Sequence, residues 1–328
     1  MNQKIRIGIV GYGNLGRGVE VAIGQNPDMS LAGIFTRRDP AAVRPLGAGV
    51  PVQPLQRIDA FADGIDVLVL CGGSRSDLPE QGPALAARFN TVDSFDTHAR
   101  IPEYFDAVDR AARGQGHASI IAVGWDPGFF SLVRAYGESV LTDGATYTFW
   151  GRGVSQGHSD AIRRVPGVRA AVQYTVPVQQ AIDRVRRGES PSLTTREKHT
   201  RECYVVLQEG ADPVTVERAI VTMPDYFADY DTTVHFTDAA TLQREHAAMP
   251  HGGFVLRTGR TGQNTPQVFE FALQLGSNPE FTACVLIAYA RAAFRLAKQR
   301  RFGAHTVFDI APGLLSPRSP AELRAQLL

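Results

Sequence analysis

The sequence predicts an α/β fold, in which a Rossmann-type doubly wound parallel sheet is joined to a second, α+β domain. Two observations support this prediction. A β-branched, apolar strand over residues 4–10 leads directly into the glycine-rich turn GYGNLG, and strands then alternate with helices as far as residue 124. Beyond that residue, apolar and polar side chains alternate along the strands, which is typical of an antiparallel or mixed sheet.

The first part of the chain has the element order that builds parallel β-α-β units. We expect strands at 31–35, 66–71, 90–93 and 118–123, and helices at 15–24, 77–89 and 101–113. These elements predict a dinucleotide-binding domain over residues 1–124.

The second part of the chain mixes strands and helices without a regular alternation. We expect strands at 145–150, 168–176, 201–208, 232–236, 254–258 and 267–275, and helices at 179–187, 213–222 and 239–247. These elements predict an α+β domain over residues 125–278. A long helix at 279–299 then begins a segment of about residues 279–328, which we expect to return to the first domain.

The glycine-rich turn fits G-x-G-x-x-G, with Gly11, Gly13 and Gly16 as its glycines. The first turns the chain tightly, the second lets backbone approach a pyrophosphate, and the third lets helix pack on strand. Because the motif follows a strand and opens a helix, whose N-terminus attracts phosphates, it favours a nucleotide site over an unliganded turn. The expected cofactor contacts are Gly11, Tyr12, Gly13, Asn14, Leu15 and Gly16, with Cys71, Gly72, Gly73 and Ser74 at the end of the strand 66–71. The Cys71 side chain is expected to pack there rather than to act as a nucleophile.

The residues after the second strand select the cofactor. An NAD site usually carries Asp or Glu there, to bind the ribose 2′-hydroxyl. Here the strand ends in Thr36, Arg37 and Arg38, so no carboxylate repels a phosphate and two guanidinium groups are available to hold one. The sequence therefore predicts NADP; the alternative is that the two arginines are a solvated surface pair.

Composition excludes several classes of protein. The net charge of +1 gives no bulk electrostatic attraction to nucleic acid or to an anionic membrane. The most apolar stretch, 281–297, is interrupted by Arg291 and Arg295, so it indicates a buried helix rather than a membrane span. The three cysteines are far apart and form no CxxC, so we expect no metal and no disulfide framework, and a cytoplasmic location.

Three aspartates follow strands of the predicted parallel sheet. Asp93 and Asp96 come after the strand 90–93, and Asp126 comes after the strand 118–123. Carboxylates at such strand ends are suited to hold an ammonium group or to assist proton transfer. The alternative for each is a helix cap or turn residue, which is common for Asp.

The second domain offers further polar candidates. The stretch from Ser155 to Asp160 is too polar for a core, and His251 lies in a turn beside two glycines, which allow a ligand to approach closely. Arg201, at the start of a strand, is either a carboxylate clamp or a solvated edge residue. Asn278 precedes a proline, as a helix N-cap does.

The sequence resembles the meso-diaminopimelate dehydrogenase family over essentially its whole length. The resemblance rests on IVGYGNLGRGVE, GIFTRR, PEQGPALA, TVDSFDTH, GWDPGFFS, TFWGRGVSQGHSDAIRRVPGV, AVQYTVP, TMPDYF, MPHGG and APGLLSP. The stretch 148–168 is the most specific of these, because generic Rossmann enzymes do not carry it.

The resemblance implies an NADP-dependent homodimer with a dinucleotide-binding domain and a substrate-binding and dimerisation domain. It implies reversible deamination of the D-centre of meso-2,6-diaminopimelate to L-2-amino-6-oxopimelate, which cyclises to tetrahydrodipicolinate, a precursor of lysine and cell wall. The implied substrate contacts are Asp93, Asp96, Asp126, Trp150, Ser155, Gln156, Gly157, Asp160, Thr175, Arg201, His251 and Asn278.

The resemblance also suggests a division of roles at the two ends of the substrate. We expect Thr175, Arg201 and His251 to hold the distal L-centre, and Asp93 and Asp126 to act as catalytic groups at the reacting D-centre. Two other functions remain as alternatives: another NADP reductase of the lysine pathway, such as a dihydrodipicolinate reductase, and a non-catalytic, NADP-binding redox sensor.

Overall fold

The computed structural model describes residues 4–328, and the chain divides into two compact units. The first contains the residues up to 132 together with 279–328, and the second contains 133–278. The predicted boundary at 124 differs from this division, which falls within helix α4 (Phe130–Val140).

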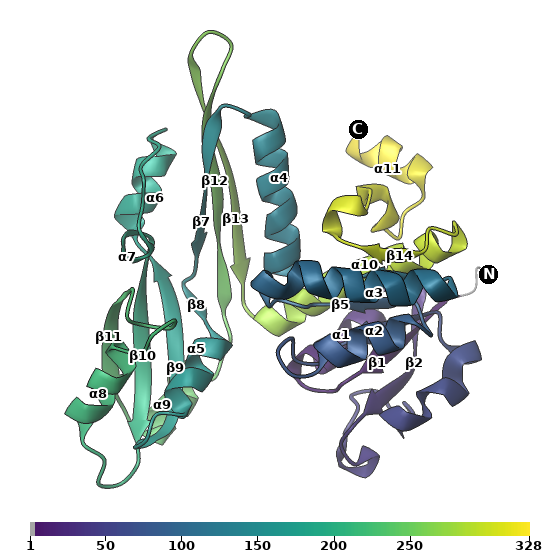
Figure 1. The fold of residues 1–328 in the computed structure, drawn as a ribbon, viewed down its shortest axis with the longest axis horizontal. Helices are drawn as coiled ribbons and strands as arrows, with labels where there is room; N and C mark the ends of the chain where they lie inside the picture. The colour runs from purple at the N-terminus through teal and green to yellow at the C-terminus, as the bar shows by residue number, and fades with distance from the viewer. Residues whose placement is uncertain (1–3) are drawn as a thin grey trace. The chain divides into compact units, whose positions relative to one another are not determined.

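The first unit is built on a seven-stranded sheet with the order β14-β6-β5-β4-β1-β2-β3 (Figure 1). Every pair of neighbouring strands in it is parallel. The strands are β1 (Ile5–Val10), β2 (Met29–Thr36), β3 (Val52–Pro54), β4 (Val67–Leu70), β5 (Thr91–Asp93), β6 (Ala118–Ile120) and β14 (Gly303–His305). The chain moves outward from β1 on one side and then restarts at β4 on the other, so the sheet is doubly wound with its switch point between β1 and β4.

Helices cover both faces of this sheet. Along β4, Val67 and Val69 belong to one buried cluster and Leu68 and Leu70 to the other, as the two-residue period of a strand requires. The first cluster includes side chains of α1 (Asn14–Gly24) and α10 (Asn278–Lys298), and the second includes side chains of α2 (Leu78–Ala86) and α3 (Ile101–Gln115). Both faces are apolar, which explains the nearly continuous apolar strands in the sequence.

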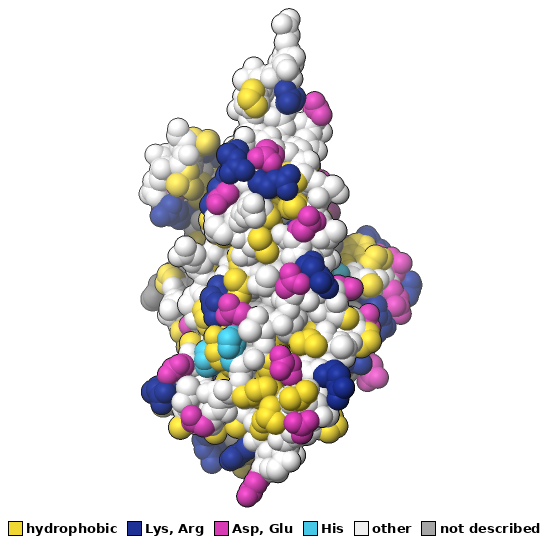
Figure 2. Space-filling model, turned by 90° about the vertical axis from the view of Figure 1, so that its left-hand side faces the viewer, with side chains coloured by type: hydrophobic (Ala, Val, Ile, Leu, Met, Phe, Trp, Pro, Cys, Tyr) yellow, Lys and Arg dark blue, Asp and Glu magenta, His cyan; other side chains and the backbone are white. Residues whose placement is uncertain are grey.

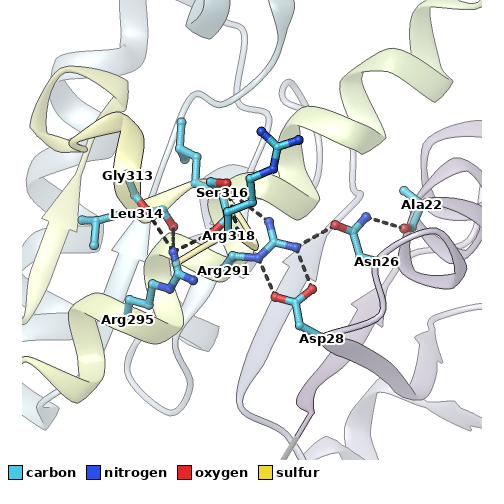
Figure 3. A network of polar contacts seen from close by, with 10 residues as sticks. Ala22, Asn26, Asp28, Arg291, Arg295, Gly313, Leu314, Ser316 and Arg318 are labelled. Carbon is cyan, nitrogen blue, oxygen red and sulfur yellow. Dashed lines mark hydrogen bonds and ion pairs between the residues drawn. The ribbon is translucent and has the colours of Figure 1, made fainter. Parts of the chain in front are cut away.

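Helix α10 is fixed to the first unit by a buried arginine (Figure 3). The Arg291 side chain is 2% exposed and its Nε donates to Asp28 at 2.6 Å. It also donates to Asn26 at 2.6 Å and to the carbonyl oxygen of Leu315 at 2.7 Å. One turn later, Arg295 donates to three carbonyl oxygens of the final segment, those of Gly313, Leu314 and Ser316. Two arginines of α10 therefore join the C-terminal segment to the start of β2.

The second unit contains two smaller sheets. One has the order β11-β10-β9-β8, in which β10 and β11 are parallel and the other pairs antiparallel; the other is antiparallel, with the order β13-β12-β7. The strands are β7 (Gly144–Trp150), β8 (Gly153–Val154), β9 (Val168–Pro177), β10 (His199–Leu207), β11 (Asp231–Phe236), β12 (His251–Thr261) and β13 (Thr265–Leu275). The helices are α5 (Gln156–Arg163), α6 (Gln179–Arg186), α7 (Thr195–Lys198), α8 (Pro213–Val221) and α9 (Ala239–His246).

Helices α5 and α8 pack on the inner face of the four-stranded sheet. Ile162 of α5 and Ile220 of α8 share a buried cluster with Cys203 and Val205 of β10. Residues 201, 203 and 205 alternate with outward residues, so Arg201 lies on this inner face although it is charged.

Several short elements were not predicted. Strands β3, β8 and β14 have two or three residues each, too few to show a period. Helix α5 contains a glycine and many polar residues, which hid its helical period.

The other elements of the chain are short. They are α11 (Pro320–Leu327), the 3-10 helices Pro40–Ala42, Leu55–Gly64, His98–Arg100, Val307–Asp309 and Pro312–Leu314, and a π-type turn at Trp125–Phe129. Within residues 4–328, no helix has the length and apolar character needed to cross a membrane.

Candidate active site

The glycine-rich turn after β1 has the geometry of a dinucleotide cradle. Gly11 has a φ of +87°, and its N–H donates to the carbonyl oxygen of Phe35 at 2.8 Å. A Cβ on Gly16 would lie 2.3 Å from the carbonyl oxygen of Gly11, so only glycine lets α1 approach β1 this closely. A Cβ on Gly13 would meet nothing within 4 Å, which leaves open space where a pyrophosphate approaches the backbone.

The loop after β4 lies beside this turn. A Cβ on Gly11 would be 3.4 Å from the backbone of Cys71, so the two loops meet at the switch point of the sheet. Asp77 accepts a hydrogen bond from the N–H of Gly73 at 2.9 Å and thereby shapes the loop. Burial raises the pKa of Cys71 to about 12, so its thiol stays protonated, in agreement with a packing role.

The two arginines after β2 have different surroundings. Arg38 donates from its guanidinium to the carbonyl oxygen of Tyr12 and from its backbone N–H to Thr36 Oγ1 at 3.0 Å. The side chain of Arg37 is 59% exposed and pairs with Asp77 at 2.6 Å. One guanidinium is thus held against the glycine-rich turn, and the other is open to a ligand phosphate. Both arginines and the cradle fit NADP.

A buried carboxylate fixes the tyrosine of the turn. Tyr12 donates its hydroxyl to Glu20 of α1, which also accepts the N–H groups of Leu46 and Gly47 at 3.1 and 2.7 Å. Burial, together with this carboxylate, raises the pKa of Tyr12 to about 12. The turn is therefore supported from α1 and from the loop after β2, a contribution of Glu20 that the sequence did not suggest.

Arg37→Gln tests the cofactor prediction. Removing this guanidinium should raise KM for NADP roughly tenfold or more, since hydrogen bonds to charged groups contribute about 1.5–3 kcal/mol, and should leave KM for NAD unchanged. The measurement is steady-state kinetics with both cofactors. Arg44→Gln is the matched control, because Arg44 is an exposed arginine further along the same connection, where among residues 4–328 it bonds to nearby carbonyl oxygens. Equal efficiency with NADP and NAD in the unaltered protein would contradict the prediction.

Asp93, predicted as a catalytic and substrate-binding carboxylate, is buried at the end of β5. Its side chain is 1% exposed, and it accepts hydrogen bonds from Tyr104 Oη at 2.7 Å and from the N–H groups of Phe95 and Ala122 at 3.0 and 3.2 Å. Burial raises its pKa to about 6, although these hydrogen bonds act in the opposite direction. Asp93 is thus a buried acceptor that ties the end of β6 to the end of β5.

Asp126 and Asp96 remain at the carboxyl edge of the sheet. Asp126 lies in the segment after β6 that Asp93 holds through Ala122, and its side chain is half-buried. Asp96 is exposed, and its N–H donates to Ser74 Oγ at 3.0 Å, which connects the loops after β4 and β5. The first unit therefore places the cofactor loops and these two carboxylates at the same edge of its sheet.

In the second unit, Arg201 is a buried guanidinium. It is 6% exposed, donates to Thr175 Oγ1 and lies 3.8 Å from the centroid of the Tyr230 ring. Among the described residues no Asp or Glu pairs with it, and its Nε has no hydrogen-bond partner. Burial lowers its pKa, as expected for a cation that lacks a counter-charge. Such a group is suited to receive a carboxylate.

Neutral histidines accompany Arg201. Burial, and then the charge of Arg201, lowers the pKa of His158 to about 4, and its Nδ1 is 2.8 Å from Ser155 Oγ. Burial likewise lowers the pKa of His199 to about 3. His199 Nε2 accepts the backbone N–H of Trp150 at 2.8 Å, and its ring stacks on the indole at 5.3 Å. Both rings stay uncharged near neutral pH, whereas the neighbouring Arg201 carries a positive charge.

The stretch from Ser155 to Asp160 forms the start of α5. Ser155 is its N-cap and accepts the N–H of His158, so its hydroxyl has a structural partner. Gln156 and Gly157 are exposed, and Gln156 Nε2 lies 3.1 Å from Met249 Sδ. Asp160 is exposed and pairs with Arg163 one turn later, which gives it a surface role in this structure.

His251 packs against β8, and Asn278 is joined by a backbone hydrogen bond to the segment just before β12. Gly153 pairs with Thr175, and a Cβ on Gly153 would lie 2.5 Å from Cγ of His251, so the imidazole packs directly on that strand. Asn278 donates its N–H to the carbonyl oxygen of Met249 at 3.0 Å. Segments far apart in sequence therefore place Thr175, Arg201, His251 and Asn278 in one region of the second unit. No group of three or more potential metal ligands occurs within residues 4–328.

Besides Glu20, four supporting residues were not predicted from the sequence, namely Tyr104, His158, His199 and Tyr230. His158 lies inside the stretch that was singled out, and its spacing from Ser155 is that of a cap. The others act through contacts between distant segments, for which the sequence carries no local signal.

Comparisons with known proteins agree with this arrangement. A family model described as the diaminopimelic acid dehydrogenase C-terminal domain matches residues 124–277. The meso-diaminopimelate D-dehydrogenase of Ureibacillus thermosphaericus is 62% identical over 325 residues, which cover 99% of both chains. The chain belongs to the diaminopimelate dehydrogenase family.

Solved structures support the same family. The C. glutamicum diaminopimelate dehydrogenase in complex with DAP aligns with a TM-score of 0.92 and 47% identity, covering 99% of this chain and 100% of that one. An engineered D-amino acid dehydrogenase bound to NADP+ aligns with a TM-score of 0.87 and 45% identity, with the same coverage. These matches confirm the predicted fold class: a Rossmann-type parallel sheet with a second domain of antiparallel and mixed sheets.

Proposed function

We propose that this chain catalyses the reversible NADP-dependent oxidative deamination of meso-2,6-diaminopimelate at its D-centre. The products are L-2-amino-6-oxopimelate, which cyclises to tetrahydrodipicolinate, and ammonia. The observation that carries the proposal is the buried Arg201, which donates to Thr175 and has no acidic partner among residues 4–328. In a member of this family, such a guanidinium is matched to the distal carboxylate of a dicarboxylic substrate.

The distal L-centre is assigned to the second unit. Arg201 binds its carboxylate, and Thr175 and His251 supply hydrogen-bonding groups beside it. A buried guanidinium without a counter-charge costs free energy. A bound carboxylate supplies that counter-charge, so binding removes this cost. Asn278 completes this group with its side-chain amide.

The reacting D-centre is assigned to Asp126, with Trp150, Gln156 and Asp96 as further contacts. Asp126 orients the ammonium and takes up its proton, because hydride leaves readily only from the carbon that bears a neutral amine. NADP, when bound in the Gly11–Gly16 cradle, accepts that hydride. Water then adds to the resulting imine carbon and ammonia leaves. Asp93 acts as a positioning residue, since it holds Ala122 and the segment that carries Asp126.

The direct test is an incubation with NADP and meso-diaminopimelate, followed by the absorbance of NADPH. We expect reduction of NADP that requires the substrate and releases ammonia in equal amount. A dihydrodipicolinate reductase would instead oxidise NADPH with dihydrodipicolinate, and a redox sensor would bind NADP without turnover. Either result would contradict the proposed function.

The proposed oligomer is a homodimer formed through the second unit. Strand β13 is the edge of its sheet, and its apolar Val268 and Phe269 are 43% and 36% exposed. Exposed apolar side chains on an edge strand are usually covered by a partner. Figure 2 shows the face of the molecule that lies on the left in Figure 1, where hydrophobic side chains lie among charged ones.

We expect a dimer mass in sedimentation at micromolar concentration. Phe269→Asp should shift the protein towards the monomer, because it places a charge on the covered edge. Val214→Asp is the control, since Val214 on α8 is 68% exposed and should stay solvated. A monomer mass for the unaltered chain would count against the proposal.

The proposed location is the cytoplasm. All three cysteines are free thiols, the state that a reducing compartment maintains. The proposed partner is the small-molecule substrate named above.

A further inference from the structure

Gln173 is a buried amide that the proposed mechanism does not use. It lies in the middle of β9, its side chain is completely buried, and neither its Oε1 nor its Nε2 has a hydrogen-bond partner among the described residues. Its backbone is fully engaged: its N–H donates to Ser159 Oγ at 2.9 Å, and its carbonyl oxygen accepts the N–H of Ser155 at 3.0 Å. The residue is thus held firmly while its side chain lacks partners.

Strand register places this amide diagonally opposite Arg201. In the antiparallel pair of β9 and β10, Thr175 faces Arg201 and Gln173 faces Cys203. Paired residues share a face of the sheet, so Gln173, Thr175, Arg201 and Cys203 lie together on the inner face. Diagonal neighbours are about 7–8 Å apart, a gap that two long side chains span. The Nε of Arg201 is also a buried polar atom without a partner among the described residues.

The two unpaired groups are complementary. Arg201 Nε–H is a donor, and Gln173 Oε1 is an acceptor. Leaving buried polar atoms unpaired is unfavourable, and leucine would fill the same space without that cost. A glutamine that destabilises the free protein at this position is explained if binding of a ligand to Arg201 brings the Arg201 Nε–H and Gln173 Oε1 together.

We propose that Gln173 is a positioning residue of the Arg201 carboxylate site, an inference that rests on the proposed function. When the distal carboxylate of the substrate binds the terminal nitrogens of Arg201, Gln173 Oε1 accepts the Arg201 Nε–H. This hydrogen bond fixes the plane of the guanidinium, which a two-pronged interaction with a carboxylate requires. Gln173 acts through Arg201 and does not touch the reacting atoms.

Thr232 offers the competing acceptor. It faces Arg201 from β11, and its Oγ1 is also buried without a partner. Gln173 is favoured because its side chain is completely buried, with two unpaired atoms instead of one. The two assignments are separable, since Thr232→Val and Gln173→Leu each remove one candidate acceptor and keep the apolar volume.

The experiment measures kcat and KM for meso-diaminopimelate in Gln173→Leu, Arg201→Met and the double variant. Gln173→Leu should lower kcat/KM about tenfold, the effect of one hydrogen bond to a charged group, through KM with kcat nearly unchanged. In the Arg201→Met background the same change should have no further effect. Thermal unfolding gives an independent readout: without substrate, Gln173→Leu should raise the melting temperature.

Two controls complete the design. Thr232→Val should leave KM unchanged. Gln208→Leu removes a glutamine of the same unit that does have a partner, the carbonyl oxygen of Val168 at 3.2 Å, and should neither raise the melting temperature nor change KM. If Gln173→Leu does not fold, Gln173→Met keeps the chain length without the amide and is measured in its place.

Each outcome has one meaning. If Arg201→Met lowers kcat/KM but Gln173→Leu does not, the positioning role of Gln173 is wrong and the proposed function stands. The same conclusion follows if Thr232→Val, instead of Gln173→Leu, lowers kcat/KM. If Gln173→Leu has the same effect with and without Arg201, Gln173 does not act through Arg201 and the inference is overturned. If Arg201→Met itself changes nothing, the carboxylate anchor of the proposed function fails.

Discussion

Arg201→Met should lower kcat/KM for meso-diaminopimelate by roughly 30- to 5,000-fold. Removing one partner of a buried, hydrogen-bonded charge pair costs about 2–5 kcal/mol, and each 1.36 kcal/mol is a factor of ten. Arg201 is buried, bonded to Thr175 and without an acidic partner within residues 4–328, so it is suited to pair with a substrate carboxylate. The loss should fall mainly on KM, because the distal end is bound equally in the ground state and the transition state.

D-Lysine provides a matched probe, since it is the substrate without its distal carboxylate. Its inhibition constant against meso-diaminopimelate should be the same for Arg201→Met and for the unaltered enzyme. Arg196→Met is the control variant, because Arg196 is an exposed arginine that pairs with Asp231. An unchanged kcat/KM for Arg201→Met would remove Arg201 from the site.

Asp126→Asn should lower kcat by roughly 10²- to 10⁴-fold, the usual contribution of a positioned acid or base. Asparagine keeps the shape of the side chain but does not take up the ammonium proton. KM should change less than kcat, because the distal anchors on the second unit are untouched. The measurement is steady-state kinetics at saturating NADP, with product analysis for ammonia.

Asp106→Asn is the control for the second experiment. Asp106 is an exposed residue of α3, a helix that contains none of the candidate site residues. We expect its kinetics to match those of the unaltered enzyme. A kcat for Asp126→Asn within about twofold of the unaltered value would exclude a role for Asp126 in proton transfer.

The parts of the fold that follow from local rules were predictable. Gly11 has a positive φ, and Gly16 lies in close contact with the backbone of Gly11. The G-x-G-x-x-G spacing predicts a glycine at both positions. Apolar periodicity located the long strands and helices. It did not locate β14, whose three residues join the sheet through pairing with β6.

Side-chain roles were less predictable, because they depend on contacts between distant segments. Asp93 has the sequence position of a catalytic carboxylate, yet Tyr104 and two backbone N–H groups take up its oxygens. Ser155 was predicted to bind substrate, and the structure shows its hydroxyl at the start of a helix that was not predicted. For Arg201 the sequence left two readings open, and burial without a counter-charge favours the carboxylate clamp over a solvated edge residue.

The stereochemistry of the reaction depends on both ends of the substrate. Hydride transfer needs the α-C–H bond to point at the nicotinamide within about 3–3.5 Å. If the distal L-centre is held by Arg201, Thr175 and His251, only one hand at the other centre meets this condition. The opposite hand places a carboxylate or an ammonium there instead.

Supplying the meso, LL and DD isomers of diaminopimelate separately, each with NADP, tests this account most directly. We predict oxidation of the meso isomer at its D-centre, no turnover of the LL isomer and much slower turnover of the DD isomer, whose distal centre has the wrong hand for the anchor. Turnover of the LL isomer at a rate comparable with the meso isomer would contradict both the anchoring scheme and the proposed function.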